Sequence, residues 1–148
     1  YRDLVLLLAK KKAESVMKKY PKNTIIASDQ ILTCKNIMIN KPSSIKQAKE
    51  NLKFIIGKNH QLISAIYVIH NQNVYFKEVK EATLFFKAIT EQQLDTYLNE
   101  NNETVLTTVG SYKIEENEKY KFIKIISGDV ETIKGFPLKN FLEKMGKR

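Results

Sequence analysis

The feature that most constrains the fold is a pair of β-patterned runs separated by a short polar turn. Residues 61–70 place Leu62, Ser64, Ile66 and Val68 on one side of a strand. Residues 74–86 form a second run, long enough to bend or to change neighbours partway. The intervening Asn71-Gln72-Asn73 is typical of a tight reversal. The sequence therefore predicts a β-hairpin around which the other elements must be placed.

Helical patterns and shorter strands lie on both sides of this hairpin along the chain. A Ser44/Gln47 pair and a Thr90/Gln93 pair each predict a capping box at a helix start. The expected helices cover 3–19, 43–56, 91–99 and a last one opened by Gly135-Phe136-Pro137; the other expected strands cover 24–28 and 121–126. The order helix, strand, helix, hairpin, helix, strand, helix predicts an α/β fold with a mixed sheet flanked by helices.

Length and composition indicate one ordinary globular domain. The chain has 148 residues, which suffices for a real core. Its single cysteine, Cys34, excludes an intramolecular disulfide and argues against a disulfide-stapled secreted protein. No apolar run approaches membrane-spanning length, and Leu4 to Ala9 is too short for a signal peptide. We therefore expect a cytoplasmic protein without a membrane partner.

The net charge of +9 suggests anionic partners. However, Arg2 and Arg148 are the only arginines, and the remaining positive charge is lysine spread along the whole chain. Arginine is the preferred residue for bidentate recognition of phosphates and bases. We therefore do not expect a nucleic-acid partner, and a lysine-rich nucleic-acid binder is kept as an alternative.

A candidate site begins at the apolar run 25–28, which is followed by Asp29 and Gln30. Lys41 follows a polar loop and is pinned by Pro42. In open α/β sheets, ligands bind beyond the carboxyl ends of strands. A carboxylate there with a lysine nearby suits a metal-bound phosphate. The alternative is structural, because many strands end in Asp for its turn chemistry.

Lys12 is an unusual residue in the first predicted helix. It lies between Leu8 and Val16 in one i, i+4 column, on the apolar side. Two interpretations are open: the side chain snorkels to solvent, or it reaches across to an anion held by the sheet. The two histidines, His60 and His70, have no second ligand at metal spacing. They therefore predict no zinc site, and we expect His60 to hydrogen-bond a loop.

Seven short segments, in this order and at these spacings, resemble the Maf family of septum-formation-inhibitor-like nucleotide pyrophosphatases. They are Leu8-Ala9-x-x-Lys12-Ala13, Ala27-Ser28-Asp29-Gln30, Lys41-Pro42, Gly57-Lys58-Asn59-His60-x-x-x-Ser64-Ala65, Phe86-Lys87-x-Ile89-Thr90, Val109-Gly110-Ser111-Tyr112 and Gly128-Asp129-x-x-x-x-x-Gly135-Phe136-Pro137-Leu138. The resemblance covers nearly the whole chain. It implies a Maf/ITPase-like twisted sheet flanked by helices, in one elongated, two-lobed domain over residues 1–148.

The resemblance also implies an activity, namely metal-dependent hydrolysis of a nucleoside triphosphate to a monophosphate and pyrophosphate. The implied role is house-cleaning of modified nucleotides or restraint of cell division. By analogy, Asp29 would hold Mg²⁺ or Mn²⁺ or act as general base on the attacking water. Lys12 and Lys41 would neutralise phosphate oxygens, and Gln30 would orient a neighbouring group. Family members are often dimeric, so a homodimer is a further expectation.

Lys87 departs from the family pattern, and Glu115 bears on the choice of substrate. Lys87 stands where the family usually has arginine, which weakens any bidentate contact with the substrate. Glu115 stands where relatives acting on thymidine or uridine triphosphate have glutamine, and the segment resembles the branch associated with 7-methylguanosine triphosphate. A carboxylate can accept hydrogen bonds from the ring N–H and amino group of guanine. The alternative is that Glu115 is simply an exposed acid beside Glu116 and Glu118.

Family members also carry a Ser-x-Ser-Pro-Arg-Arg loop ahead of a helix. The sequence begins at Tyr1 without this segment, so we expect a domain that is N-terminally truncated relative to the family. Because that loop should cradle phosphates, a catalytically impaired nucleotide-binding module that regulates division through a partner is the second alternative.

Overall fold

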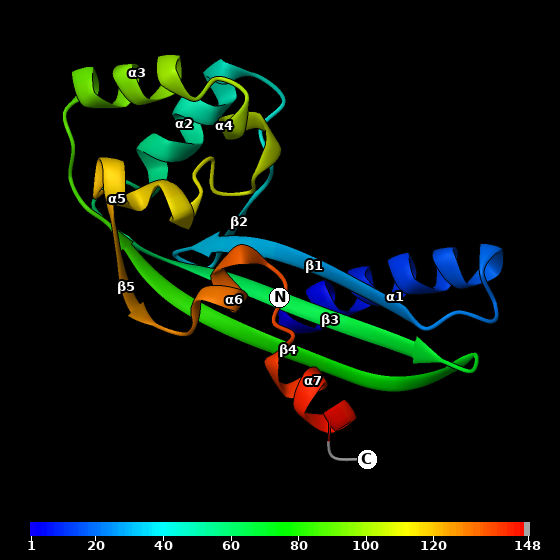
Figure 1. Cartoon of the computed structure of the whole chain (residues 1–148). Coiled ribbons are helices and arrows are strands. Elements are labelled where there is room, and N and C mark those ends of the chain that lie inside the picture. The colour runs from blue at the N-terminus through cyan, green and yellow to red at the C-terminus, as the bar shows by residue number, and fades with distance from the viewer. Residues whose placement is uncertain (147–148) are drawn as a thin grey trace. The chain divides into compact units, whose positions relative to one another are not determined.

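The computed structural model describes residues 1–146, which form a five-stranded sheet flanked by helices (Figure 1). The strands are β1 (Ile25–Cys34), β2 (Ile37–Ile39), β3 (Asn59–His70), β4 (Asn73–Phe86) and β5 (Ile123–Ser127), in the spatial order β2-β1-β3-β4-β5. The helices are α1 (Arg2–Lys19), α2 (Ile45–Ile55), α3 (Glu91–Glu100), α4 (Thr104–Thr107), η1 (Ile114–Glu116), α5 (Asn117–Tyr120), α6 (Val130–Lys134) and α7 (Lys139–Gly146). The predicted α/β fold is confirmed. The sheet is antiparallel rather than mixed, and tight hairpins join β1 to β2 and β3 to β4.

Two hairpins turn on pairs of residues with positive φ. The predicted one uses Asn71 and Gln72, at φ 51° and 66°, between β3 and β4. The other uses Lys35 and Asn36, at φ 52° and 62°, between β1 and β2. Positive φ at both central residues is the geometry of type I′ turns, whose twist matches that of the flanking strands. Both reversals are therefore local features of the sequence.

The second hairpin corrects the prediction of a short strand over 24–28. β1 continues to Cys34, and its last three residues pair with β2 in the register Leu32↔Ile39, Thr33↔Met38 and Cys34↔Ile37. Residues 31–34 are all buried, which explains why the strand does not stop at the polar pair. Asp29 and Gln30 therefore lie inside a strand and not at its carboxyl end.

The described chain divides into two compact units. Unit 1 comprises residues 1–30, 63–81 and the segment from 129 onward, and unit 2 comprises residues 31–62 and 82–128. The three long strands β1, β3 and β4 each contribute residues to both units.

In unit 1, α1 buries a narrow column of small side chains. Val5, Ala9 and Ala13 are fully buried at i, i+4 spacing, whereas Val16 is 42% exposed. The predicted apolar side of this helix is therefore displaced, and the interpretation that Lys12 lies on the buried side is wrong. A separate cluster packs Phe141 of α7 against Ile66 and Val68 of β3.

In unit 2, the two predicted capping pairs differ in outcome. Thr90 and Gln93 form the complete box at the start of α3. At α2, Ser44 Oγ accepts from Gln47 N as predicted, but Gln47 Oε1 accepts from Ser43 N at 2.7 Å instead of from Ser44. The first contact confirms the N-cap, and the second replaces half of the predicted box.

The C-terminal part has one more helix than the sequence predicts. The sequence predicts that the segment around Gly135 opens the last helix, but α7 begins at Lys139. Gly135 instead ends α6 in the left-handed region at φ 95°. Helices of four or five residues, such as α4, α5 and α6, are too short to show helical periodicity in the sequence.

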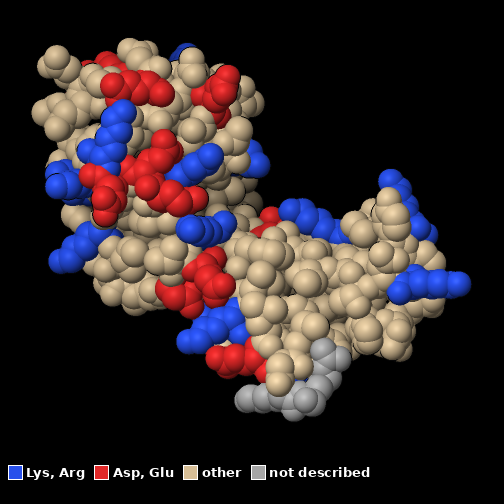
Figure 2. Space-filling view, in the orientation of Figure 1, with Lys and Arg blue, Asp and Glu red and all other residues tan. Residues whose placement is uncertain are grey.

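Red and blue side chains are interspersed over one part of the face drawn in Figure 2, and the rest of that face is mostly uncharged, with a few basic side chains. Ion pairs form within unit 2, where Lys49 Nζ lies 2.7 Å from Asp95 and Lys53 Nζ lies 2.9 Å from Glu91. Among residues 1–146, no helix combines the length and apolarity needed to cross a membrane.

Candidate active site

The centre of the candidate site is an ion pair in unit 1 between α1 and β1. Lys12 Nζ lies 3.4 Å from Asp29 Oδ1 and donates to the carbonyl oxygen of Ser28 at 3.3 Å. The Lys12 side chain is 59% exposed and that of Asp29 is 19% exposed. The Lys12 side chain is therefore exposed to solvent and at the same time paired with a carboxylate of the sheet, and its contact with a bound anion stays a prediction.

The two sides of the Asp29 carboxylate differ. Oδ1 faces Lys12 and also accepts from the backbone N–H of Gln30 at 2.8 Å. Among residues 1–146, the hydrogen bond and the ion pair recorded for the Asp29 carboxylate both involve Oδ1 and not Oδ2. Within the same range, no three His, Cys, Asp or Glu side chains are grouped closely enough to hold a metal by themselves. Oδ1 of Asp29 is thus held in a fixed orientation, while Oδ2 is available to contact a ligand.

Gln30 is held by a hydrogen-bond network inside unit 1. Its Nε2 donates to the carbonyl oxygens of Thr132 (3.0 Å) and Ile133 (2.9 Å) and to Ser64 Oγ (3.1 Å). Ser64 Oγ in turn donates to the Thr132 carbonyl at 2.7 Å. A Cβ added at Gly135 would lie 3.4 Å from Gln30 Cδ, so the backbone packs closely on this amide. The network links β1, β3 and α6 directly beside Asp29, and such support keeps a reactive group in a fixed geometry.

A second ion pair in unit 1 was not predicted. Lys80 Nζ donates to Asp129 Oδ2 at 2.6 Å, and Asp129 Oδ1 accepts from Thr132 N at 2.8 Å as the N-cap of α6. The hydrogen bond from Lys80, followed by those from Thr132, lowers the pKa of Asp129 to about 2. The pattern Asp129-x-x-Thr132 at a helix start could have identified the cap, but the partner lysine lies 49 residues away along the chain.

The other three predicted site residues, Lys41, Lys87 and Glu115, belong to unit 2 and are all exposed. Lys41 precedes the buried Pro42 between β2 and α2. Lys87 directly follows β4, and its backbone N–H donates to the carbonyl of Phe122 at 2.9 Å. Glu115 lies in η1. Their exposure leaves the charged groups accessible to an anion or a base.

His60 forms a buried polar pair in unit 2. Its Nε2 lies 2.6 Å from the hydroxyl of Tyr112, and the imidazole is fully buried. Burial lowers the pKa of His60 to about 4 and raises the pKa of Tyr112. The predicted hydrogen bond from His60 to a loop is confirmed, since Tyr112 lies in the segment before η1.

The sequence is similar to known proteins along its whole length. The family description "Maf-like protein" matches residues 1–148. A nucleoside triphosphate pyrophosphatase of Bradyrhizobium diazoefficiens is 36% identical over 137 residues, which are 93% of this chain and 67% of that protein. A 7-methyl-GTP pyrophosphatase of Rhizobium meliloti is 32% identical over 143 residues, 97% of this chain and 71% of that protein. A 7-methyl-GTP pyrophosphatase of Rhizobium etli is 33% identical over 139 residues, 94% of this chain and 69% of that protein.

Proposed function

The chain belongs to the Maf-like protein family, and we propose that it hydrolyses a nucleoside triphosphate to a nucleoside monophosphate and pyrophosphate. In this reaction water attacks the α-phosphorus, a new P–O bond forms, and the bond to the pyrophosphate breaks. The protein must orient the water and stabilise the negative charge that develops on the leaving group.

The observation that best supports the proposal is the pairing of Lys12 with Asp29 on a strand anchored by Gln30. The carboxylate is partly accessible and has an available oxygen, Oδ2, that can accept a proton from the attacking water. The ammonium is exposed and lies 3.4 Å from the carboxylate, so it can contact an oxygen of the bound phosphate. The Gln30 network fixes the strand and therefore the direction of the carboxylate.

The residues present also fit a hard divalent cation. Mg²⁺ is commonly bound through one or two carboxylates, with waters and substrate phosphates completing its shell. We propose that Asp29 would hold Mg²⁺ or Mn²⁺ in this way. When bound, the ion would neutralise negative charge on the substrate phosphates.

We also propose roles for the three predicted residues of unit 2. Lys41 and Lys87 neutralise phosphate charge, Lys87 as a point charge rather than a bidentate group. Glu115 accepts hydrogen bonds from a guanine edge, which favours a 7-methyl-GTP-like substrate and a house-cleaning role. The names of the relatives support both this nucleotide and nucleoside triphosphates in general.

The test is pyrophosphate release from a panel of triphosphates, including 7-methyl-GTP, with Mg²⁺ or Mn²⁺. Asp29→Asn should lower the rate about 10²- to 10⁴-fold, because the amide can neither take a proton nor carry charge. Asp95→Asn is the matched control, since it removes another carboxylate paired with a lysine and should leave the rate unchanged. An Asp29→Asn variant with the original rate would contradict the proposal.

Two further outcomes are informative. Nucleotide binding without pyrophosphate release would overturn the proposed turnover in favour of a binding module. Glu115→Gln should lower the ratio of 7-methyl-GTP to UTP hydrolysis, because an amide can also donate to a pyrimidine carbonyl. An unchanged ratio would remove Glu115 from base recognition while leaving the hydrolysis intact.

A further inference from the structure

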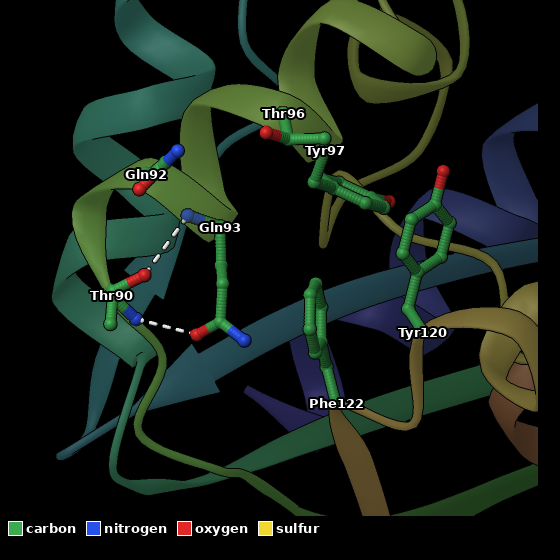
Figure 3. Close-up of a pocket in the computed structure, with 7 residues that line it drawn as sticks. All are labelled: Thr90, Gln92, Gln93, Thr96, Tyr97, Tyr120 and Phe122. Atoms are coloured by element: carbon green, nitrogen blue, oxygen red, sulfur yellow. Dashed lines mark hydrogen bonds between the residues drawn. The ribbon is translucent and has the colours of Figure 1, made fainter.

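Unit 2 contains a pocket that the proposed hydrolysis does not use. It has a volume of about 310 Å³ and lies between the start of α3 and the segment that joins α5 to β5 (Figure 3). This size is at the lower end of small-molecule pockets, about 300–1,000 Å³. Its lining consists of Thr90, Gln92, Gln93, Thr96, Tyr97, Tyr120 and Phe122. None of the six proposed site residues is among them.

One side of the pocket is a cluster of three aromatic rings. Tyr97 and Tyr120 meet edge to face with centroids 4.8 Å apart, and Tyr120 and Phe122 lie at 5.4 Å with an angle of 34° between planes. The phenol groups are tied away from the pocket: Tyr97 Oη donates to the Ser111 carbonyl at 2.7 Å, and Tyr120 Oη donates to Glu100 at 2.8 Å. The rings are therefore fixed. Tyr97 and Phe122 are largely buried, at 3% and 8% exposure, so the half-buried ring of Tyr120 is the one on which a planar ring system can stack.

The opposite side offers a directed hydrogen-bond donor. In the capping box, Gln93 Oε1 accepts from Thr90 N at 2.8 Å, which uses one lone pair of this oxygen. The same bond fixes the amide plane, and the Gln93 NH₂ group points toward Phe122 (Figure 3). A ligand ring lying against the aromatic cluster can therefore accept a hydrogen bond from this NH₂ group, whose direction is fixed by the capping bond.

The lining carries no ionised group. All seven residues are hydroxyl, amide or aromatic side chains, and burial raises the pKa of the Tyr97 phenol further from neutrality. A phosphate placed in this pocket would find no cation in the lining, whereas the Lys12–Asp29 site has an exposed ammonium. The pocket thus favours an uncharged ligand.

From these three properties we propose that the pocket is a second site that binds a neutral purine nucleoside. A purine ring supplies the planar face for the aromatic cluster and the ring nitrogen acceptor for Gln93. A nucleoside carries no phosphate and is therefore uncharged, like the lining of the pocket. This site is independent of the proposed hydrolysis and does not require Asp29 or a metal.

The test is an NMR and calorimetric titration of the full chain with purine riboside and with its 5′-monophosphate. Purine riboside is chosen because it has ring acceptors but no exocyclic amine. We expect saturable binding with Kd about 0.1–1 mM, at least as tight as that of the monophosphate, and nuclear Overhauser contacts from purine protons to Tyr120 and Phe122. No saturation in the millimolar range would overturn the proposal. So would tighter binding of the monophosphate that is lost in Lys12→Met, because this result would place the ligand at the proposed active site.

A matched pair of variants isolates the donor. Gln93→Glu keeps an acceptor for the cap, since Glu suits this position as well as Gln, but removes the NH₂ group. We expect Kd to rise about 3- to 10-fold, the effect of one lost hydrogen bond. Gln47→Glu makes the same change at the start of α2, where Gln47 also caps the backbone, and should leave Kd unchanged. Equal effects of the two variants would contradict a site at Gln93.

Discussion

Two polar pairs, one in each unit, show how differently this protein uses charge. In unit 1, Lys12 and Asp29 form an ion pair whose lysine is 59% exposed. In unit 2, His60 and Tyr112 form a neutral hydrogen-bonded pair in which the histidine is fully buried and its pKa is about 4. Burying a charge costs far more than burying a hydrogen-bonded neutral group. Ionised groups therefore remain where solvent and an anionic ligand can reach them, and the buried pair serves packing.

The largest effect is expected from a variant that breaks the buried pair of His60 and Tyr112. His60→Ala removes a fully buried side chain and leaves the Tyr112 hydroxyl without this partner, so the free energy of unfolding should fall by about 3–4 kcal/mol. Urea unfolding at pH 7.5 measures the loss. His70→Ala is the control: His70 is exposed and bonds Thr24, and its loss should cost less than about 1 kcal/mol. Equal losses would mean that burial does not separate the two histidines.

The second prediction uses pH to sharpen the same contrast. The pKa of His60 falls from 6.5 to about 4 on folding, so between these values the unfolded chain binds more protons than the folded one. Stability should therefore be complete above pH 6.5 and should decrease by about 3 kcal/mol as the pH falls to 4. His60→Gln should lose this part of the slope. The check is unfolding in urea from pH 8 to pH 4; parallel curves for the two proteins would contradict the buried neutral state.

The third prediction concerns the exposed pair. Lys12→Met should lower kcat/KM for pyrophosphate release about 10- to 100-fold, because one ammonium near the phosphate is lost. Its stability should change by less than about 0.5 kcal/mol, since exposed ion pairs contribute little. Lys10→Met, on the same helix and also exposed, is the matched control and should change neither quantity. A large loss of stability without loss of activity would reverse the roles assigned to the two pairs.

The smallest effect concerns Lys80 and Asp129, a charged pair of unit 1 with a structural role. Asp129→Asn keeps an N-cap but removes the charge. The lowered pKa, about 2 against 3.8, means that the ionised carboxylate stabilises the fold above pH 3.8 and that this contribution is lost toward pH 2. Because Asp129 is 42% exposed, we discount the contribution to about 1 kcal/mol. The difference between wild type and variant should be present in urea unfolding at pH 5 and absent at pH 2; a constant difference would exclude the charge as its source.

The sequence predicted features whose determinants are close together along the chain. Asn71-Gln72 indicated the β3–β4 hairpin, and Thr90 with Gln93 indicated the cap of α3. The extension of β1 was not predicted, because the polar residues Asp29 and Gln30 interrupt the apolar run in the sequence.

The candidate site was predictable to a similar extent. Lys12 was singled out because a lysine interrupted an apolar column, but its ion pair with Asp29 was not predicted. The Lys80–Asp129 pair and the Gln30–Thr132 contact join residues 49 and 102 positions apart, so no spacing in the sequence indicates them. Such contacts depend on the tertiary structure.

The two type I′-like turns have a consequence for protein engineering. Asn36 and Gln72 hold positive φ without being glycine, a conformation that is costly for residues with a Cβ. Glycine adopts it freely, and an asparagine followed by a glycine is the preferred dipeptide of such a turn, which Gln72→Gly would create after Asn71. Gln72→Gly is therefore expected to raise the thermal stability of the protein without altering any residue of either proposed site.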